Sequence, residues 1–209
     1  MNVKVCGMRN AQNIQEVERL GIDMMGFIFW PPSSRYVSER PAYLPTKCKR
    51  VGVFVDQPLE EVMQTALDYS LDYIQLHGYE SPDYLRQLRS PSFAVIKAFN
   101  IATAADFVQT EAYRGLADAF LFDTKGKSVG GNGEKFDWGV LDSYDSDVPF
   151  LLSGGICPAD APSVRSLFAS DREPFASKCI GIDLNSRFET APGMKDAAAL
   201  RRFLSALNP

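Results

Sequence analysis

A cysteine near the amino terminus offers the clearest chemistry in this sequence. Cys6 ends the apolar run 2–6 and is followed at once by Gly7, the pattern of a buried β-strand giving way to a loop. A thiolate can act as a general base or a nucleophile, but an ordinary thiol is mostly protonated at neutral pH and needs a cation or donor beside it. A buried structural cysteine is the alternative, and the strand-end position leaves both interpretations open.

An aspartate follows a second apolar run in the same way. Asp123 ends the run 119–123, so its carboxylate is expected to project from the end of a strand. Beside an apolar pocket the pKa of such a carboxyl rises, and the group can then donate a proton as a general acid. The alternative is an aspartate that caps the following turn.

Two further side chains could hold or orient a ligand. Arg35, in the loop segment 32–36, carries a guanidinium that can pair bidentately with a carboxylate, although an exposed loop arginine needs no function. His77 is the only histidine in the chain, and we expect it to orient or pack rather than to catalyse.

Two segments rich in glycine and polar side chains suggest an anion site. Gly154 and Gly155 follow the apolar residues 150–152, and glycine lets backbone amides approach an anion closely. Asn185 and Ser186 follow the last apolar run and add side-chain donors. A short Ser-Gly-Gly segment is by itself more typical of a turn, but loops after the seventh and eighth strands of a barrel often bind phosphate.

The elements that would position these side chains alternate along the chain. Continuous apolar runs, typical of parallel strands covered on both faces, predict strands at 2–6, 24–29, 50–55, 72–76, 93–99, 117–122, 149–152 and 179–184. Amphipathic stretches predict helices at 11–20, 58–68, 82–89, 103–112, 159–169 and 195–207, with shorter and weaker candidates at 38–44 and 138–143. Pro58, Pro82 and Pro158 each open one stretch, where the missing N–H of proline costs nothing.

We therefore expect an α/β fold, a single-domain (β/α)8 TIM barrel that spans residues 1–209. Eight strands leave roughly 26 residues per unit, a tight fit for a minimal barrel, and a doubly wound open sheet is the alternative. In a barrel the site lies at the carboxyl ends of the strands. The segment 125–135 would be a long loop after the sixth strand, and loops of that kind are usually functional lids.

The bulk composition excludes several classes of protein. The net charge of −4 and the lack of a basic run argue against a nucleic-acid partner. No stretch approaches the roughly 18 apolar residues of a membrane span, and the amino terminus lacks a signal peptide, so we expect a cytoplasmic protein. Cys6, Cys48, Cys157 and Cys179 lie too far apart for a zinc or redox pair and are expected to be reduced thiols. We expect Cys157 to pack, and Cys48 and Cys179 to lie away from the active face.

Taken together, these segments resemble the phosphoribosylanthranilate isomerase family of tryptophan biosynthesis, and the resemblance runs nearly end to end. Each motif alone is modest, but their shared order and spacing are highly specific. The motifs are Lys4–Met8, Gly26–Phe29, Ser33–Arg35, Val51–Phe54, Gln75–Gly78, Asp123–Thr124, Gly130–Gly133, Phe136–Trp138, Leu152–Gly155, Gly181–Ser186 with Glu189, and Gly193–Asp196.

The resemblance implies an Amadori rearrangement of N-(5'-phosphoribosyl)anthranilate to the corresponding deoxyribulose phosphate. Cys6 matches the general base of the family and Asp123 its general acid, while Arg35 matches the arginine that holds the anthranilate carboxylate. The loops at Gly154–Gly155 and Asn185–Ser186 would hold the phosphate. The reaction needs one acid and one base and no metal or organic cofactor, and we expect a monomer whose only partner is this small-molecule substrate.

The chain departs from the family pattern at two positions. Asn132 stands where the glycine loop usually carries a hydroxyl residue, which leaves open any hydroxyl role there. Arg187 stands where many members carry glycine, and it either adds a charge toward the phosphate or points to solvent. Neither position is the proposed acid or base.

Three alternatives compete with this interpretation. The related isomerase of histidine biosynthesis resembles a two-fold repeat with an aspartate as base, whereas this chain has Cys6 and no evident halves. Indole-glycerol-phosphate synthase needs lysine and glutamate at strand ends, and the end of strand one offers neither. Because Lys97 lies inside the fifth strand, this enzyme remains an alternative. Another phosphate-binding barrel enzyme, or a non-catalytic sugar-phosphate binder on a degenerate barrel, is the third.

Overall fold

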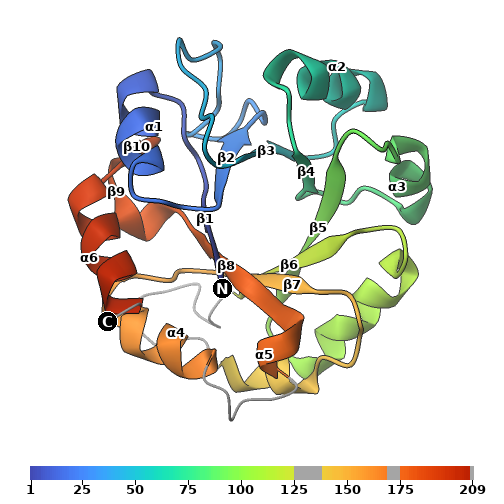
Figure 1. The fold of residues 1–209 in the computed structure, drawn as a ribbon. Helices are drawn as coiled ribbons and strands as arrows, with labels where there is room; N and C mark the ends of the chain where they lie inside the picture. Colours follow the sequence, from blue (N-terminus) through green and yellow to red (C-terminus); the bar gives the residue numbers. More distant parts are fainter. Residues whose placement is uncertain (125–137, 169–174, 208–209) are drawn as a thin grey trace.

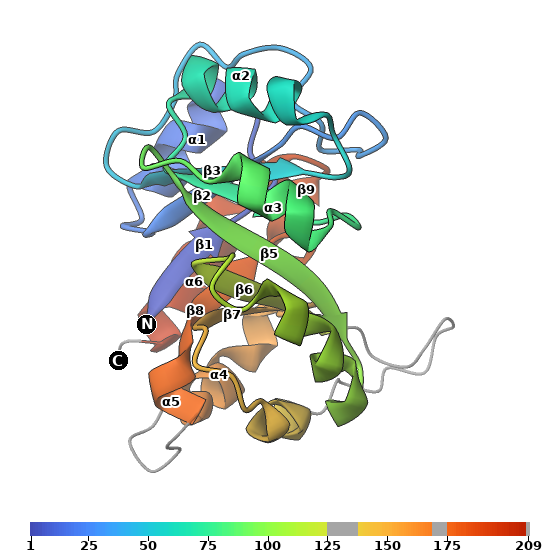
Figure 2. The ribbon, with the colours of Figure 1, turned by 90° about the vertical axis from the view of Figure 1, so that its right-hand side faces the viewer.

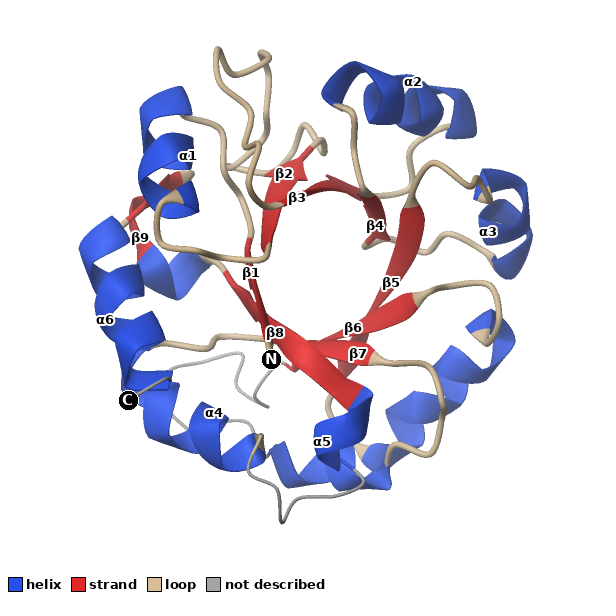
Figure 3. Ribbon diagram, viewed as in Figure 1, coloured by secondary structure: helices blue, strands red, loops and turns tan. Residues whose placement is uncertain are grey.

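Eight parallel strands close into a barrel in the computed structural model, which describes residues 1–124, 138–168 and 175–207 (Figures 1 and 3). The strands pair in sequence order, and β8 returns to β1. They are β1 (Asn2–Val5), β2 (Met24–Ile28), β3 (Lys49–Phe54), β4 (Tyr73–Leu76), β5 (Ala94–Ile101), β6 (Ala119–Thr124), β7 (Phe150–Ser153) and β8 (Cys179–Leu184). The expected barrel is confirmed, and the doubly wound sheet is excluded because that sheet has open edges.

The helices form a ring outside the strands, blue around red in Figure 3. The α-helices are α1 (Ala11–Glu18), α2 (Leu59–Tyr69), α3 (Pro82–Leu88), α4 (Ala161–Leu167), α5 (Phe175–Lys178) and α6 (Ala197–Leu207). The 3₁₀ helices are η1 (Ala104–Tyr113), η2 (Trp138–Ser143), η3 (Pro158–Asp160) and η4 (Ser186–Phe188), and a hairpin joins β9 (Glu189–Ala191) to β10 (Met194–Lys195). None of the helices in the described ranges is long and apolar enough to cross a membrane.

Most of the predicted elements are present, with three differences. The candidate helix at 38–44 is wrong, because Pro41 and Pro45 each remove a backbone donor and restrict the residue before them. The stretches 103–112 and 138–143 form the 3₁₀ helices η1 and η2 rather than α-helices. The stretch 159–169 is divided between η3 and the shorter helix α4.

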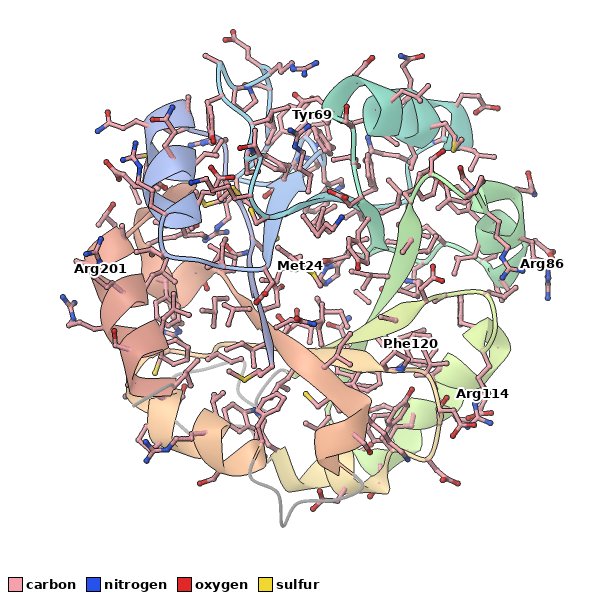
Figure 4. All side chains as sticks on the ribbon, viewed as in Figure 1. Met24, Tyr69, Arg86, Arg114, Phe120 and Arg201 are labelled. Carbon is pink, nitrogen blue, oxygen red and sulfur yellow. The ribbon has the colours of Figure 1, made fainter. Side chains whose placement is uncertain are left out.

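The strands separate two apolar regions. Inside the barrel the buried apolar side chains are few and entirely aliphatic, namely Met24, Val51, Ile96, Ala98, Ala119, Leu121 and Leu151. Figure 4 shows Met24 within the ring of strands, whereas Phe120 lies outside it and Arg86, Arg114 and Arg201 project from the outer surface. In the view turned by 90°, β5 runs obliquely across the barrel (Figure 2), as the tilt of barrel strands requires. Successive side chains of a strand alternate between the barrel interior and the layer between strands and helices. Residues two apart on a strand therefore face the same region.

Candidate active site

The thiol of Cys6 lies just beyond the end of β1, between β8 and β2. The Cys6 N–H donates to the carbonyl of Leu184 at 2.9 Å, and the Gly7 N–H donates to the carbonyl of Gly26 at 2.9 Å. Cys6 is only 3% exposed. A Cβ built on Gly26 would lie 2.7 Å from Cys6 Sγ, so glycine at this position of β2 makes the room that the thiol fills.

A buried lysine accompanies this thiol on the inner face of β1. Lys4 precedes Cys6 by two residues and so faces the same side of the strand. Its Nζ donates to Asp183 Oδ1 at 2.9 Å, because the β1–β8 register places Lys4 beside Asp183. Burial lowers the pKa of Lys4, but Asp183 and Cys6 outweigh burial and raise the pKa overall, so Lys4 is an ammonium.

The pKa of the Cys6 thiol reflects opposing influences. Burial raises this pKa and is the largest effect, and the Asp183 carboxylate raises it further. Lys4, within hydrogen-bonding reach of the thiol, and the more distant Lys195 act in the other direction. The net shift is upward. The free protein therefore holds Cys6 mainly as a neutral thiol, and the nearby ammonium groups reduce the cost of ionising it.

The candidate acid, Asp123, faces the mouth of the barrel from β6. The β5–β6–β7 register sets it between Asn100 and Ser153. His77, just after β4, places Nε2 at 3.8 Å from Asp123 Oδ2, and both side chains are partly exposed. The Gln75 amide lies 3.1 Å from His77 Nδ1. The His77 ring is therefore held between the Gln75 amide and the Asp123 carboxyl. The structure thus places His77 beside Asp123, and its orienting role stays a prediction.

Arg35 is anchored rather than free in its loop. Its Nε donates to Glu189 at 2.9 and 3.0 Å and its Nη2 donates at 2.7 Å, so two of its three nitrogens are engaged. Glu189 also accepts from Lys195 Nζ at 2.5 Å. Burial raises the pKa of Glu189, but the hydrogen bonds from Arg35 and Lys195 hold it below its ordinary value. An anionic Glu189 therefore orients Arg35, and no hydrogen bond from Nη1 occurs among the residues that the structure describes.

The two expected anion-binding loops lie side by side after β7 and β8. Gly154 and Gly155 have φ angles of 102° and 67°, a conformation that favours glycine. No atom of the described part of the chain, apart from the residues next to Gly155, lies within 4 Å of a Cβ built on it, so open space adjoins the loop there. Asn185 Oδ1 accepts from Lys195 Nζ at 2.7 Å, which orients its amide. Ser186 begins η4 and is exposed, as is Arg187.

One further candidate from the sequence, Lys97, does not face the candidate site. Lys97 lies on the outer face of β5, since its neighbours Ile96 and Ala98 belong to the interior cluster, and it pairs with Glu80 at 3.2 Å. That position removes the main argument for an indole-glycerol-phosphate synthase. Asn132 and the whole of the expected loop 125–135 lie outside the described residues.

The other cysteines lie where packing or the opposite end of the barrel was expected. Cys157 begins η3, where its N–H donates to Asp160 Oδ2 at 2.9 Å. Cys48 lines a hollow of about 790 Å³ at the amino ends of the strands, and Cys179 is buried at the start of β8. Burial raises the pKa of both Cys48 and Cys179 to about 12. These two thiols are therefore inert at neutral pH.

Sequence reasoning missed the charged residues that surround the candidate site. Lys4 and Asp183 lie within motifs already recognised but were given no role, and the same is true of Glu189 and Lys195. The available signal was Lys4 itself, a lysine two residues before Cys6 within an apolar strand, which must share its face. Within the described ranges, no group of three His, Cys, Asp or Glu side chains could hold a metal ion.

Comparison with known proteins gives a consistent result over nearly the whole chain. The family model for N-(5'-phosphoribosyl)anthranilate (PRA) isomerase matches residues 3–206. The N-(5'-phosphoribosyl)anthranilate isomerase of Phocaeicola vulgatus is 47% identical and covers 99% of this chain and 98% of its own. That of Parabacteroides distasonis is 45% identical, with 99% of this chain and 93% of its own covered.

Solved structures agree in fold. The phosphoribosyl anthranilate isomerase of Thermotoga maritima superposes with a TM-score of 0.79 at 30% identity, over 99% of this chain and 98% of the other. A structure of a phosphoribosyl anthranilate isomerase in complex with reduced 1-(o-carboxyphenylamino)-1-deoxyribulose 5-phosphate gives a TM-score of 0.78 at 27% identity, with the same coverage.

Proposed function

The chain belongs to the N-(5'-phosphoribosyl)anthranilate isomerase family, and from this premise we propose how its side chains perform the reaction. The protein is an isomerase of tryptophan biosynthesis that converts N-(5'-phosphoribosyl)anthranilate to 1-(2-carboxyphenylamino)-1-deoxyribulose 5-phosphate. The observation that carries the mechanism is the placement of one thiol and one carboxyl at the carboxyl ends of β1 and β6, two strands that are not neighbours in the barrel.

Asp123 acts first, as the general acid. Its carboxyl donates a proton to the ring oxygen of the ribose, the bond between C1 and that oxygen breaks, and the nitrogen lone pair forms an iminium at C1. His77 Nε2, at 3.8 Å from Asp123 Oδ2, orients the carboxyl during this step. Asp123 is left as a carboxylate.

Cys6 acts second, as the general base. Its thiolate removes the proton from C2, and the electrons of the C2–H bond move toward the iminium to give an enolamine. The enolamine then gains a proton at C1 and loses the proton of the C2 hydroxyl, which yields the ketone. Because an acid and a base suffice, the chemistry is complete with side chains alone.

The remaining site residues bind the two anionic ends of the substrate. Arg35, aligned by Glu189, offers its Nη1 to the anthranilate carboxylate. The backbone amides at Gly154 and Gly155, together with Asn185 and Ser186, hold the phosphate beside the open space at Gly155. Local donors are needed because the protein as a whole carries a net charge of −4.

We also propose that the chain works as one catalytic domain and as a monomer in the cytoplasm. Its four cysteines are free thiols, which suits a reducing compartment. Every side chain assigned above comes from this one chain. Sedimentation of the purified protein at assay concentration should therefore give the mass of a single chain, and a dimer that loses activity on dissociation would contradict the monomer.

Substitution of the two proton-transfer groups tests the mechanism. Cys6→Ala and Asp123→Asn should each lower kcat by about 10²–10⁴-fold, the usual contribution of one positioned acid or base. Calorimetric binding of the reduced product analogue should be nearly unchanged in both. Near-wild-type turnover by either variant would remove that residue from the mechanism, and loss of analogue binding together with turnover would point to a misfolded site.

A further inference from the structure

Lys4 is a fully buried charge that the mechanism above does not use. Its side chain is 0% exposed and lies below Cys6 on the inner face of β1, so it cannot reach the substrate directly. On the adjacent strand β2 its register partner is the apolar Met24, which belongs to the interior cluster. A lone ammonium is costly in such surroundings, so its partners there indicate what it does.

Two partners surround the Lys4 ammonium. On one side Nζ donates to Asp183 Oδ1 at 2.9 Å. On the other side a Cβ built on Gly26 would lie 2.7 Å from Cys6 Sγ and 3.1 Å from Lys4 Nζ, so the thiol and the ammonium border the same narrow gap. The ammonium therefore bridges a carboxylate that fixes its position and the sulfur atom that must become an anion.

We propose that Lys4, held by Asp183, is a positioning residue that stabilises the thiolate of Cys6 and so sets the pH range in which this base works. The inference rests on the proposed function, in which Cys6 is the general base. Lys4 acts through Cys6 alone: it orients the sulfur and lowers the free energy of its ionised form, and it neither touches the substrate nor transfers a proton.

The charges that face Cys6 allow the sign of each pKa shift to be predicted. They are Lys4 from β1, Asp183 from β8, Lys195 from β10 and Arg35 from the loop after β2. Lys4 favours the thiolate, whereas Asp183 opposes it. Removal of the Lys4 charge must therefore raise the pKa of the thiol, and removal of the Asp183 charge must lower it. A residue that merely supports the fold would not produce shifts of opposite sign.

The experiment titrates Cys6 by its ultraviolet thiolate absorbance, with the spectrum of the matching Cys6→Ala protein subtracted in each background. Lys4→Met should move the titration to higher pH and Asp183→Asn to lower pH. In parallel, kcat/KM of Lys4→Met should fall on the order of tenfold at neutral pH for each unit of pKa gained, and should recover as the pH rises.

Lys97→Met serves as the matched control, because Lys97 is a similarly buried, ion-paired lysine that does not face Cys6. It should leave the thiol titration at its wild-type position. If Lys4→Met fails to fold, the double variant Lys4→Met/Asp183→Asn, which buries no unpaired charge, takes its place. That variant should still titrate above the wild type, since Lys4 is the stronger of the two influences.

The outcomes separate this proposal from the proposed function. A folded Lys4→Met or double variant with an unshifted thiol titration would overturn the role of Lys4, whatever the activity. A shifted titration with near-wild-type activity in Cys6→Ala would instead overturn Cys6 as the base, and with it the catalytic meaning of the shift. Equal shifts in Lys4→Met and Lys97→Met would also overturn the proposal, because the effect would then be a general consequence of destabilisation.

Discussion

Two buried lysine–carboxylate pairs lie in different layers of this barrel. Lys4 and Asp183 meet inside the strands at 2.9 Å, against the thiol of Cys6. Lys97 and Glu80 meet outside the strands at 3.2 Å, where Lys97 Nζ also donates to the Gly78 carbonyl at 2.8 Å and lies over two aromatic rings. Both lysines are nearly inaccessible, yet only the inner one touches a group that can take part in proton transfer.

The difference teaches that burial and pairing do not by themselves mark a functional lysine. Burial dominates at Lys97 and lowers its pKa despite Glu80, whereas Asp183 and Cys6 outweigh burial at Lys4 and raise its pKa. Glu80 also accepts the backbone N–H groups of Asp56 and Gly78, so the outer pair ties two loops together. The inner pair lies against the thiol of the candidate site, whereas the outer pair stabilises the loops after β3 and β4.

The largest expected contrast comes from adding one methyl group beside each cluster. Gly26→Ala would press against both Cys6 Sγ and Lys4 Nζ, and a displaced base should lower kcat on the order of 100-fold. Gly78→Ala would instead press against the Asp56 carboxylate, with a loss of about 1–3 kcal/mol in unfolding free energy and a smaller effect on kcat. Steady-state kinetics and urea unfolding of both variants measure the contrast, and equal effects on kcat would break it.

Removal of the outer lysine, Lys97, should lower the free energy of unfolding. Lys97→Met leaves Glu80 buried without its cation, and breaking a buried pair in this way costs about 3–5 kcal/mol. Urea unfolding at neutral pH should therefore show a lower midpoint with an unchanged slope. An unfolding free energy equal to that of the wild type would contradict a scaffold role for the pair.

As the pH rises into the alkaline range, the contributions of Lys4 and Lys97 to the free energy of unfolding should change in opposite directions. The raised pKa of Lys4 contributes stability below its ordinary pKa of 10.5, and this contribution disappears as the pH rises through the folded-state pKa. The lowered pKa of Lys97 makes the neutral form the favoured one in the fold, so its contribution grows as the pH rises toward 10.5.

Unfolding curves at several alkaline pH values check these signs. The destabilisation caused by Lys4→Met should shrink as the pH rises, and that caused by Lys97→Met should grow. Parallel changes in both variants would show that the two environments do not differ as described.

A third buried lysine, Lys195, lies at the barrel mouth, where it belongs to the site but does not contact the thiol of Cys6. Lys195 and Glu189 hold Arg35 without touching the thiol, and Glu189→Asp keeps the charge but shortens the side chain. Loss of the bidentate geometry should raise KM several-fold while kcat stays within about twofold, because only binding of the carboxylate is affected. A change confined to kcat would place Glu189 in the chemical step instead.

The sequence predicted the barrel and its strand boundaries well because buried parallel strands appear as continuous apolar runs, such as 119–122 and 179–184. It also placed Cys6 and Asp123 at strand ends, which follows from those runs. The engagement of Arg35 by Glu189 was not predictable, because the two residues are 154 positions apart and meet only through closure of the barrel. The spacing of two residues from Cys6 could have placed Lys4 on the inner face, whereas the outer face of Lys97 became clear only from the interior cluster of its neighbours Ile96 and Ala98.

Conversion of N-(5'-phosphoribosyl)anthranilate by the purified wild-type protein tests the central claim most directly. The loss of substrate should be followed by fluorescence beside an enzyme-free control, because the substrate also decays unaided, and the product should be identified by mass and chromatography. The account predicts rapid formation of 1-(2-carboxyphenylamino)-1-deoxyribulose 5-phosphate that depends on Cys6. No acceleration by the folded protein over the control would contradict it and leave a barrel that binds sugar phosphates without turning them over.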